Sequence, residues 1–316
     1  MESVLVTGGA GFIGSNLAEA LLSMGYEVTI IDDLSTGKMG NIEGLLKNSR
    51  LSFFEGSILD AGLLKSVIGQ KGVTLISHQA AIPSVAKSID NPPRSMQANV
   101  VGTSTLFDVA ARAGCKRIVF ASSSSIYGDT PELPKRESMP LNPKSPYAVS
   151  KAAKEMLARV FSGLYGMEIV GLRYFNVYGR RQDPASEYAA VVPKFVTRAM
   201  RGEPITIEGD GLQTRDFTYI DDVIQANIKA LTGREVQSGA FNIAFGERIS
   251  VMDLAQMILK ITGSKSQIVH NPPRPGDVRD SLADIENARR LLGYSPSLAL
   301  KGGLEETVKW FKNGAV

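Results

Sequence analysis

The chain has 316 residues, of which 43% are hydrophobic and 21% charged, and its net charge is +3. This composition is typical of a globular protein with a large core, and the dispersed Lys and Arg argue against nucleic-acid binding, which needs a clustered basic surface. A single cysteine, Cys115, excludes an intramolecular disulfide framework, and two histidines, His78 and His270, are too few for a His-rich metal site.

The first predicted strand, Val4–Thr7, leads directly into a glycine-rich turn. Glycines stand at positions 8, 9, 11 and 14, and the apolar helical stretch Leu17–Met24 follows. Strand, glycine turn and helix in this order are the context of a dinucleotide-binding fingerprint, because glycines allow a tight turn and let backbone N–H groups approach a pyrophosphate. The alternative is an ordinary glycine-rich turn between a strand and a helix.

The second predicted strand, Glu27–Asp32, ends in an acidic residue. Asp32 follows Gly14 by 18 positions. A carboxylate there can bind both ribose hydroxyls of a dinucleotide and would repel a 2′-phosphate. The sequence therefore predicts a site for NAD rather than NADP.

Strand-like and helical segments continue to alternate as far as Tyr174. We expect further strands at Leu51–Glu55, Val73–His78, Arg117–Ala121 and Ile169–Tyr174, and helices that include Ser95–Ala113 and Pro146–Tyr165. This alternation predicts an α/β fold, a Rossmann-type doubly wound parallel sheet with helices on both faces. A ligand is expected at the carboxyl ends of the strands.

Tyr147 and Lys151 stand four residues apart on the predicted helix Pro146–Tyr165, after the serine-rich run Ser122–Gly128. Residues at i and i+4 share one helix face, so the phenol and the ammonium emerge side by side. A phenol titrates near pH ~10, and a nearby cation favours the phenolate and lowers this pKa. With a serine hydroxyl close by, the pattern indicates proton transfer to or from an alcohol or ketone, although Tyr-x-x-x-Lys also occurs by chance on surface helices.

The sequence changes character after Tyr178. Residues 179–184 are typical of a loop, and later segments are rich in Gly and Pro, while Asp216–Ile220 and Ala240–Ala244 are interpreted as further strands that return to the sheet. We therefore expect a Rossmann domain of residues 1–177 plus returning segments near 216–244. A smaller discontinuous domain would comprise residues 178–215 and 245–316, with the ligand in the cleft between the two domains.

Eight motifs spread over nearly the whole chain extend this pattern. They are T-G-G-A-G-F-I-G (7–14), H-Q-A-A (78–81), N-V-V-G-T (99–103), S-S-S-S-I-Y-G (122–128), Y-A-V-S-K (147–151), R-Y-F-N-V-Y-G (173–179), G-D-G-L-Q-T-R-D-F (209–217) and R-P-G-D (274–277). With these motifs in this order, the chain resembles the extended short-chain dehydrogenase/reductase family, and within it the NAD-dependent UDP-sugar 4-epimerases.

The resemblance implies a role for each motif residue. Tyr147 would be the catalytic base and acid, Ser123 its hydroxyl partner four residues before Tyr127, and Lys151 would bind the nicotinamide ribose and depress the pKa of Tyr147. The implied cofactor-binding residues are Gly8, Gly11, Phe12, Ile13, Gly14, Asp32, Leu34, Ser35, Thr36, Gly37, Ser57, Ile58, Gln79, Ala80, Ala81, Asn99, Ser122, Tyr147, Lys151 and Tyr174. The implied substrate contacts are Ser84, Ser123, Tyr147, Asn176, Ala190, Val191, Lys194, Thr206, Arg215, Arg274, Asp277 and Ser281.

Two positions within these sets have alternatives. Arg215 and Arg274 suit a diphosphate because a guanidinium matches phosphate in a bidentate fork, but Arg215 could instead pair with Asp216. The family's third strand usually ends in G-D-I, whereas this chain has Ser57 in place of the Asp. Ser57 can still accept a hydrogen bond, so an adenine contact there is less well supported than the phosphate contacts.

The implied reaction is reversible C4 epimerisation of a UDP-hexose through a 4-keto sugar. Related dehydratases place an acidic residue after the Ser/Thr and related decarboxylases usually carry a Glu there, whereas this chain has Ser124 and Ser125. Asp32 argues against an NADPH-consuming reductase. A non-enzymatic NAD-sensing protein can lose the catalytic set, which this chain retains.

The breadth of the substrate range is inferred from Ser281. Alignment on the family pattern places Ser281 near the sugar 2-substituent, where a Tyr would block an N-acetyl group and a Ser leaves room. The resemblance therefore predicts turnover of UDP-GlcNAc/UDP-GalNAc as well as UDP-Glc/UDP-Gal, although Ser281 could equally be a solvated loop residue.

Oligomeric state and location are also expectations. Family members commonly dimerise through the helices at about 95–113 and 147–165, and Leu106, Val109, Met156 and Val160 would allow a homodimer or serve a buried core. No run of 18 apolar residues and no leader-like N-terminus is present. We expect a cytoplasmic protein that binds no membrane, no nucleic acid and no metal.

Overall fold

The computed structural model describes residues 2–184, 190–234, 236–273 and 278–313. Within them a seven-stranded sheet has the order β11-β6-β5-β4-β1-β2-β3, and every pairing in it is parallel. The strands are β1 Ser3–Thr7, β2 Glu27–Asp32, β3 Leu51–Glu55, β4 Leu75–His78, β5 Arg117–Ser123, β6 Glu168–Tyr174 and β11 Gly239–Ile243. The predicted fold class is confirmed. The strand order reverses between β1 and β4, which is where such sheets bind ligands.

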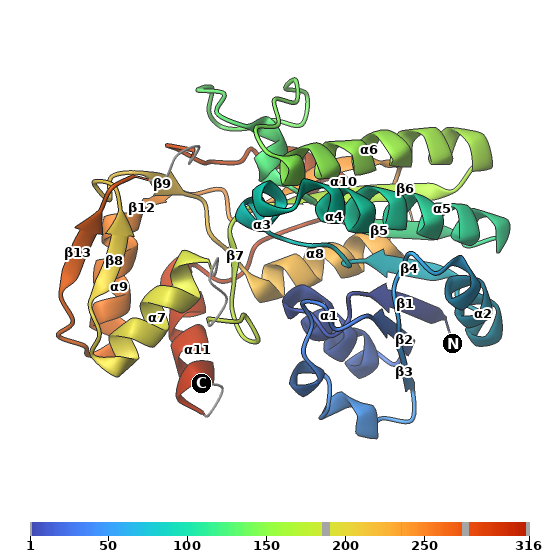
Figure 1. Cartoon of the computed structure of the whole chain (residues 1–316), viewed down its shortest axis with the longest axis horizontal. Helices are drawn as coiled ribbons and strands as arrows, with labels where there is room; N and C mark the ends of the chain where they lie inside the picture. Colours follow the sequence, from blue (N-terminus) through green and yellow to red (C-terminus); the bar gives the residue numbers. More distant parts are fainter. Residues whose placement is uncertain (1, 185–189, 235, 274–277, 314–316) are drawn as a thin grey trace.

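Helices cover both faces of this sheet (Figure 1). One face carries α2 (Ala61–Lys71), α5 (Gly102–Arg112) and α6 (Pro146–Tyr165), and the other carries α1 (Phe12–Ser23) and α8 (Ile220–Thr232). Each face has its own apolar core: Leu64, Leu106 and Phe107 on the first, Leu17 and Val223 on the second. The sheet is therefore buried on both sides, which explains its nearly continuous apolar strands.

Helix α6, which carries the Tyr-Lys pair, has strong local start and stop signals. The Ser145 side chain accepts a hydrogen bond from Ala148 N, Pro146 occupies the first turn, and Gly166 ends the helix with a φ of +67°. Serine caps, an N-terminal proline and a left-handed glycine are the residues that these positions favour. The predicted bounds match the structure.

The predicted helix Ser95–Ala113 is helical along nearly its whole length, but it is not one continuous α-helix. Helix α4 (Pro92–Met96) begins earlier, because the Asn91 side chain accepts from Arg94 N and Pro92 follows it, and a π-helical turn, Gln97–Val101, separates α4 from α5. Such wide turns often occur at functional sites, and this one contains Asn99. A short helix, α3 (Val85–Asp90), precedes this region.

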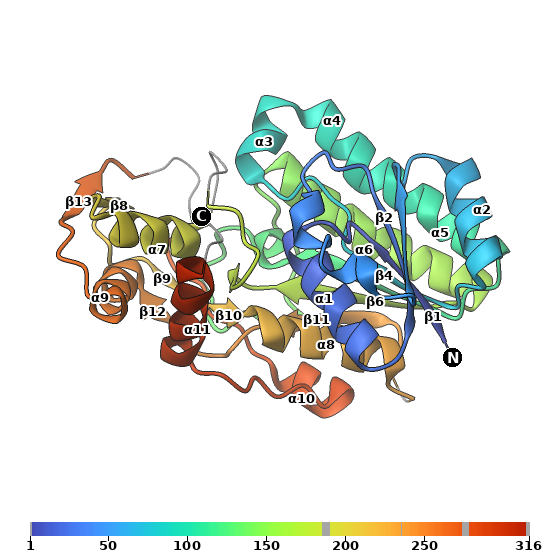
Figure 2. The same ribbon diagram turned by 90° about the horizontal axis from the view of Figure 1, so that it is seen from below.

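A second group of elements lies beside the sheet (Figures 1 and 2). It contains α7 Val191–Arg201, α9 Val251–Thr262, α11 Leu300–Lys312 and the parallel pair β8 Ile205–Glu208 and β13 Ile268–Asn271. The smaller elements are β7 Val177–Tyr178, β9 Thr214–Arg215, β10 Thr218–Tyr219, β12 Ile249–Ser250 and α10 Glu286–Leu292. Among the described helices, none is long and apolar enough to cross a membrane.

The two predicted returning segments behave differently. Ala240–Ala244 corresponds to β11, which joins the sheet beside β6 as predicted. Asp216–Ile220 does not join the sheet, because Thr218–Tyr219 pairs with β7 and helix α8 begins at Ile220. The short segment between Asp216 and Asp221 is compatible both with a two-residue strand and with the buried start of a helix.

Candidate active site

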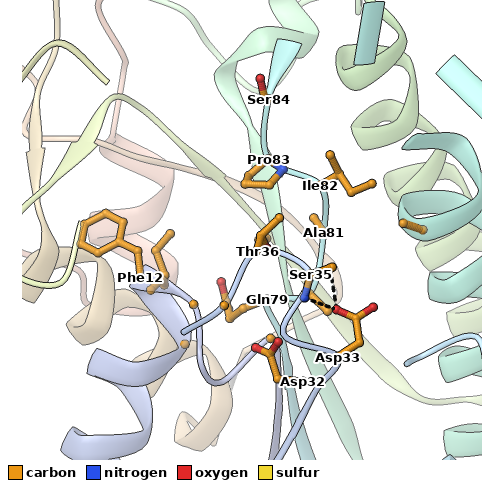
Figure 3. Close-up of a pocket in the computed structure, with 18 of the residues that line it drawn as sticks. Phe12, Asp32, Asp33, Ser35, Thr36, Gln79, Ala81, Ile82, Pro83 and Ser84 are labelled. Atoms are coloured by element: carbon orange, nitrogen blue, oxygen red, sulfur yellow. Dashed lines mark hydrogen bonds between the residues drawn. The ribbon is translucent and has the colours of Figure 1, made fainter. Parts of the chain in front are cut away.

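A cleft of about 1360 Å³ opens at the carboxyl ends of the strands, next to the point where their order reverses. All the predicted cofactor-binding residues line it except Asn99. Figure 3 shows three sources of this lining. Phe12 comes from α1, Asp32 from the end of β2 with Asp33, Ser35 and Thr36 after it, and Gln79, Ala81, Ile82, Pro83 and Ser84 from the segment after β4. Residues far apart in sequence therefore meet as the parallel-sheet topology predicts.

The glycine turn has no room for side chains. A Cβ on Gly14 would lie 2.1 Å from the carbonyl oxygen of Gly8, and a Cβ on Gly8 would lie 2.6 Å from Ala80 N, with a φ of +70° at Gly8. Helix α1 starts directly after Gly11, without an acidic residue in its first turn. Because first-turn N–H groups lack intrahelical partners, this turn fits a pyrophosphate.

Asp32 lies at the end of β2 with its carboxylate held by the backbone. Oδ2 accepts from Ala10 N and Oδ1 from Leu34 N, each at 2.9 Å. Burial raises the pKa of Asp32, against these hydrogen bonds. The neighbouring Asp33 accepts from Ser35, both from its N–H and from its hydroxyl (Figure 3). A fixed carboxylate at the cleft wall fits the ribose hydroxyls of a dinucleotide that lacks a 2′-phosphate.

Tyr147, Lys151 and Ser123 meet at the cleft wall, the first two from α6 and the third from the end of β5. The Ser123 hydroxyl lies close enough to the Tyr147 phenol to lower its pKa. Lys151 Nζ lies 5.4 Å from the centre of the Tyr147 ring and donates to Ala121 O at 2.9 Å. A hydroxyl, a phenol and a buried amine thus lie together at the cleft wall, which suits proton transfer at a substrate oxygen.

The pKa of Tyr147 differs from expectation. Burial raises it, and the nearby Ser123 hydroxyl only partly opposes this rise. Burial also lowers the pKa of Lys151 to about 8. We expected Lys151 to lower the pKa of Tyr147, but desolvation disfavours the charged forms of both groups and dominates in the chain alone.

A buried ion pair lies behind Ser123. The Arg173 guanidinium donates to both Glu155 oxygens, at 3.0 and 2.7 Å, and the Ser122 hydroxyl donates to Glu155 Oε1 at 2.6 Å. Arg173 also donates to the Tyr127 hydroxyl at 2.7 Å. The Tyr127 hydroxyl in turn donates to Asn242 Oδ1. Neither Arg173 nor Glu155 was singled out from the sequence, although each lies in or next to a motif. The pair fixes the end of β5 that carries Ser123.

Asn99 supports the site from below the cleft wall. Its Nδ2 donates to Ser150 Oγ at 3.0 Å and its Oδ1 accepts from Ile82 N at 2.8 Å. The π-helical turn that contains Asn99 is therefore tied both to α6 and to the segment after β4. Tyr174 lies at the cleft and hydrogen-bonds with Asn227, and burial raises its pKa to about 12.

The predicted substrate contacts divide into two sets. Ser84, Ser123, Tyr147, Asn176 and Ala190 line the cleft. Five others lie on or beside the second group of elements and do not line the cleft, namely Val191, Lys194, Thr206, Arg215 and Ser281. Arg274 and Asp277 lie outside the described residues. The alternative Arg215–Asp216 pair is not favoured, because the Asp216 carboxylate accepts from the backbone N–H groups of Phe245, Gly246 and Ala283.

Several cleft residues had no signal in the sequence. Lys38 and Asp183 form an ion pair of 2.8 Å at the cleft. Lys87 and Arg94 reach the cleft from α3 and α4, and Trp310 reaches it from α11. These residues are distant in sequence and come together only through tertiary packing.

His78 and Lys154 form a buried polar cluster behind Ala80. His78 contacts Thr7 Oγ1 at 2.8 Å and Thr103 Oγ1 at 2.9 Å, and Lys154 Nζ lies 3.1 Å from His78 Nε2. Burial lowers the pKa of both groups well below its usual value. Within the described part of the chain, no group of three or more His, Cys, Asp and Glu side chains could hold a metal.

The chain matches the model of the NAD dependent epimerase/dehydratase family over residues 4–244. It is 39% identical over 311 residues to the UDP-glucose 4-epimerase of Mycolicibacterium smegmatis, covering 98% of both chains. It is also 33% identical over 319 residues to a UDP-N-acetyl-alpha-D-glucosaminuronate decarboxylase of Bacillus cytotoxicus, covering 98% of this chain and 97% of that one.

Solved structures show the same similarity. The UDP-glucose 4-epimerase of Thermotoga maritima, solved with UDP-glucose, has a TM-score of 0.94 and 38% identity, covering 98% of this chain and 99% of that one. The UDP-N-acetylglucosamine 4-epimerase of Methanobrevibacter ruminantium, solved with UDP-N-acetylmuramic acid, has a TM-score of 0.94 and 38% identity, covering 99% and 98%.

Proposed function

This chain belongs to the NAD dependent epimerase/dehydratase family, so NAD is its cofactor, and we propose that it catalyses the reversible C4 epimerisation of a UDP-hexose. The observation that carries this proposal is the meeting of Tyr147, Ser123 and Lys151 at the wall of a cleft that fits a dinucleotide. The relatives of known structure that bind UDP-sugars support the substrate class.

NAD, when bound, supplies the acceptor and donor for hydride at C4. Tyr147 Oη takes the proton from the C4 hydroxyl as the ketone forms and returns a proton to the C4 oxygen when the ketone is reduced on its opposite face. Ser123 Oγ hydrogen-bonds the same oxygen and orients it. Lys151, anchored on Ala121 O, holds positive charge near the phenol while its amine is protonated, and so favours the phenolate.

Related dehydratases and decarboxylases carry an acidic residue directly after the Ser/Thr, where this chain has two serines. Ser124 and Ser125 follow Ser123 in the short helix Ser124–Tyr127, and Ser125 N donates to Ser123 Oγ at 3.2 Å. A hydroxyl has no proton to release near neutral pH, so elimination of water or loss of carbon dioxide has no evident acid at this position. A decarboxylase remains the second candidate, because one such enzyme is similar along nearly the whole chain.

The test is incubation of the purified protein with UDP-glucose, followed by NMR of the sugar anomeric signals. Formation of UDP-galactose supports the proposal. If folded protein that contains NAD forms no UDP-galactose but converts UDP-glucuronate to a UDP-pentose and carbon dioxide, the decarboxylase is favoured.

We also propose that N-acetylated sugars are substrates. Ser281→Tyr is then expected to lower kcat/KM for UDP-GlcNAc at least about tenfold. The loss of one well-fitting contact in a substrate pocket lowers kcat/KM by about 10–200-fold. The reaction with UDP-glucose should change less than threefold. Ser281 is anchored through its N–H to Thr214 O, next to Arg215. Rates for both sugars measured in parallel check this, with Ser281→Ala as the control. An equal loss for both sugars would contradict it.

A homodimer is proposed through an exposed apolar face on α6. Val149, Met156, Val160 and Leu164 are exposed at helical spacing, Met156 by 62% and Leu164 by 71%. Leu106, which we also considered for this face, is fully buried in the core and does not belong to it. An apolar row on one helix face suits a second copy of the same chain. Light scattering should give twice the 33.9 kDa chain mass, and a mass of one chain at micromolar concentration would contradict the proposal.

A further inference from the structure

Backbone N–H groups from two segments, residues 245–246 and residue 283, converge on the carboxylate of Asp216. Oδ1 accepts from Phe245 N at 3.1 Å, both oxygens accept from Gly246 N at 3.3 and 3.2 Å, and Oδ2 accepts from Ala283 N at 3.2 Å. The side chain is fully buried. A buried carboxylate that bonds only to backbone N–H groups in the described chain is unusual, because buried charges are normally paired with cations.

The same residue joins three of the proposed substrate contacts. The Asp216 carbonyl oxygen accepts from Asn176 Nδ2 at 2.8 Å, and Asn176 has a φ of +32°, a strained value for a residue with a side chain. Arg215 immediately precedes Asp216. Ser281 lies two residues before Ala283, and its N–H donates to Thr214 O at 3.1 Å. A shift at Asp216 would therefore move all three.

We propose that Asp216 is a positioning residue that sets Asn176, Arg215 and Ser281 in register for the nucleotide-sugar, without touching it. This inference rests on the proposed function, since those three residues are proposed substrate contacts. It assigns to the carboxylate the task of joining Phe245, which follows β11 of the sheet, to the segment that carries Ser281 and Ala283. The Asp216 carbonyl oxygen adds the link to Asn176, which follows β6.

A carboxylate suits this junction better than an amide. An ionised carboxylate only accepts hydrogen bonds and has about four acceptor positions, whereas the NH₂ of an amide would face a backbone N–H. Burial raises the pKa of Asp216 to about 7, against the hydrogen bonds from Ala283, Gly246 and Phe245, and Glu247 raises it further. The Tyr294 hydroxyl donates to Ala244 O at 2.8 Å, and burial raises its pKa, as do the charges of Asp222 and Asp216. Acid therefore converts one acceptor oxygen into a donor and loosens the junction.

The test is Asp216→Asn, studied as full-length protein with bound NAD. KM for UDP-glucose should rise at least about tenfold, since an unpaired buried N–H is costly, while kcat changes less than threefold and NAD content is unchanged. Asp222→Asn is the matched control, because Asp222 is also buried but accepts from Ser297 N and the Ser297 hydroxyl rather than from residues 245, 246 and 283. Unchanged KM in a folded Asp216→Asn protein would overturn the inference.

Two further measurements keep the inference testable if the variant does not fold or the chain is not an epimerase. Calorimetry gives the Kd of the wild-type protein for UDP-glucose without any turnover. This Kd should rise as the pH falls from 8 to 6, through the pKa of about 7 for Asp216. The sugar diphosphate itself does not titrate in this range. A Kd independent of pH would overturn the inference. A pH-dependent Kd without any epimerisation would uphold it and refute the proposed reaction alone.

Discussion

Tyr147→Phe is expected to lower kcat for C4 epimerisation by about 10²–10⁴-fold, the usual contribution of a positioned general acid–base group. The variant loses only the hydroxyl that takes and returns the proton at the C4 oxygen. The phenyl ring still fills its place on α6 beside Lys151, whose amine is anchored on Ala121 O. Rapid-quench or NMR rates with UDP-glucose check the loss, and cofactor content is expected to match that of the wild type.

Tyr165→Phe is the matched control for this prediction. Tyr165 stands at the end of the same helix and is 48% exposed, so loss of its hydroxyl should leave kcat within about twofold. A Tyr147→Phe protein with kcat within fivefold of the wild type would remove the phenol from the reaction. A fall in the control as large as that at Tyr147 would point instead to disturbance of α6.

Glu155→Gln is expected to destabilise the fold by about 3–5 kcal/mol, because it leaves the buried Arg173 guanidinium without its counter-charge. The side chains of Arg173 and Glu155 are only 6% and 11% exposed. Ser122, next to the proposed catalytic Ser123, would also lose its charged acceptor. Urea unfolding at pH 7 with saturating NAD measures the loss as a change in midpoint.

The matched control is Glu168→Gln. Glu168 pairs with Arg117, but its side chain is 46% exposed and Arg117 also donates to the carbonyls of Ala230, Leu231 and Gly233. Loss of the Glu168 carboxylate should lower the free energy of unfolding by less than about 1 kcal/mol, as is usual for surface ion pairs. Equal midpoint changes in the two variants would contradict the view that the Glu155–Arg173 pair is the critical support behind β5.

Local signals in the sequence were sufficient to predict the strands of the sheet and the C-terminal end of α6. Strands Glu27–Asp32 and Leu51–Glu55 have the predicted bounds because their apolar runs are bounded by turn residues. The glycine turn and the Tyr147–Lys151 pair were found because short-range spacing determines their geometry. The strand prediction for Asp216–Ile220 is wrong because so short a segment, with only Phe217, Tyr219 and Ile220 apolar or aromatic, does not distinguish a strand from a helix start.

Contacts between distant residues had no such signal. The ion pair of Lys38 with Asp183, the contact of Lys154 with His78 and the hydrogen bonds of Asp216 each join segments that are close only in the folded chain. The rise in the pKa of Tyr147 could not be predicted from the sequence either. The spacing showed the neighbouring cation, Lys151, but not that both groups are buried. Desolvation depends on tertiary packing, which one sequence does not reveal.

The most direct test of the account is epimerisation of UDP-glucose in D₂O, followed by NMR of the C4 position of the UDP-galactose formed. In the proposed reaction the C4 hydrogen leaves and returns as hydride, while Tyr147 handles only the oxygen-bound proton. The product should therefore retain protium at C4 through many turnovers. Deuterium at C4 would contradict the account, because it would show that a base removes this hydrogen as a proton.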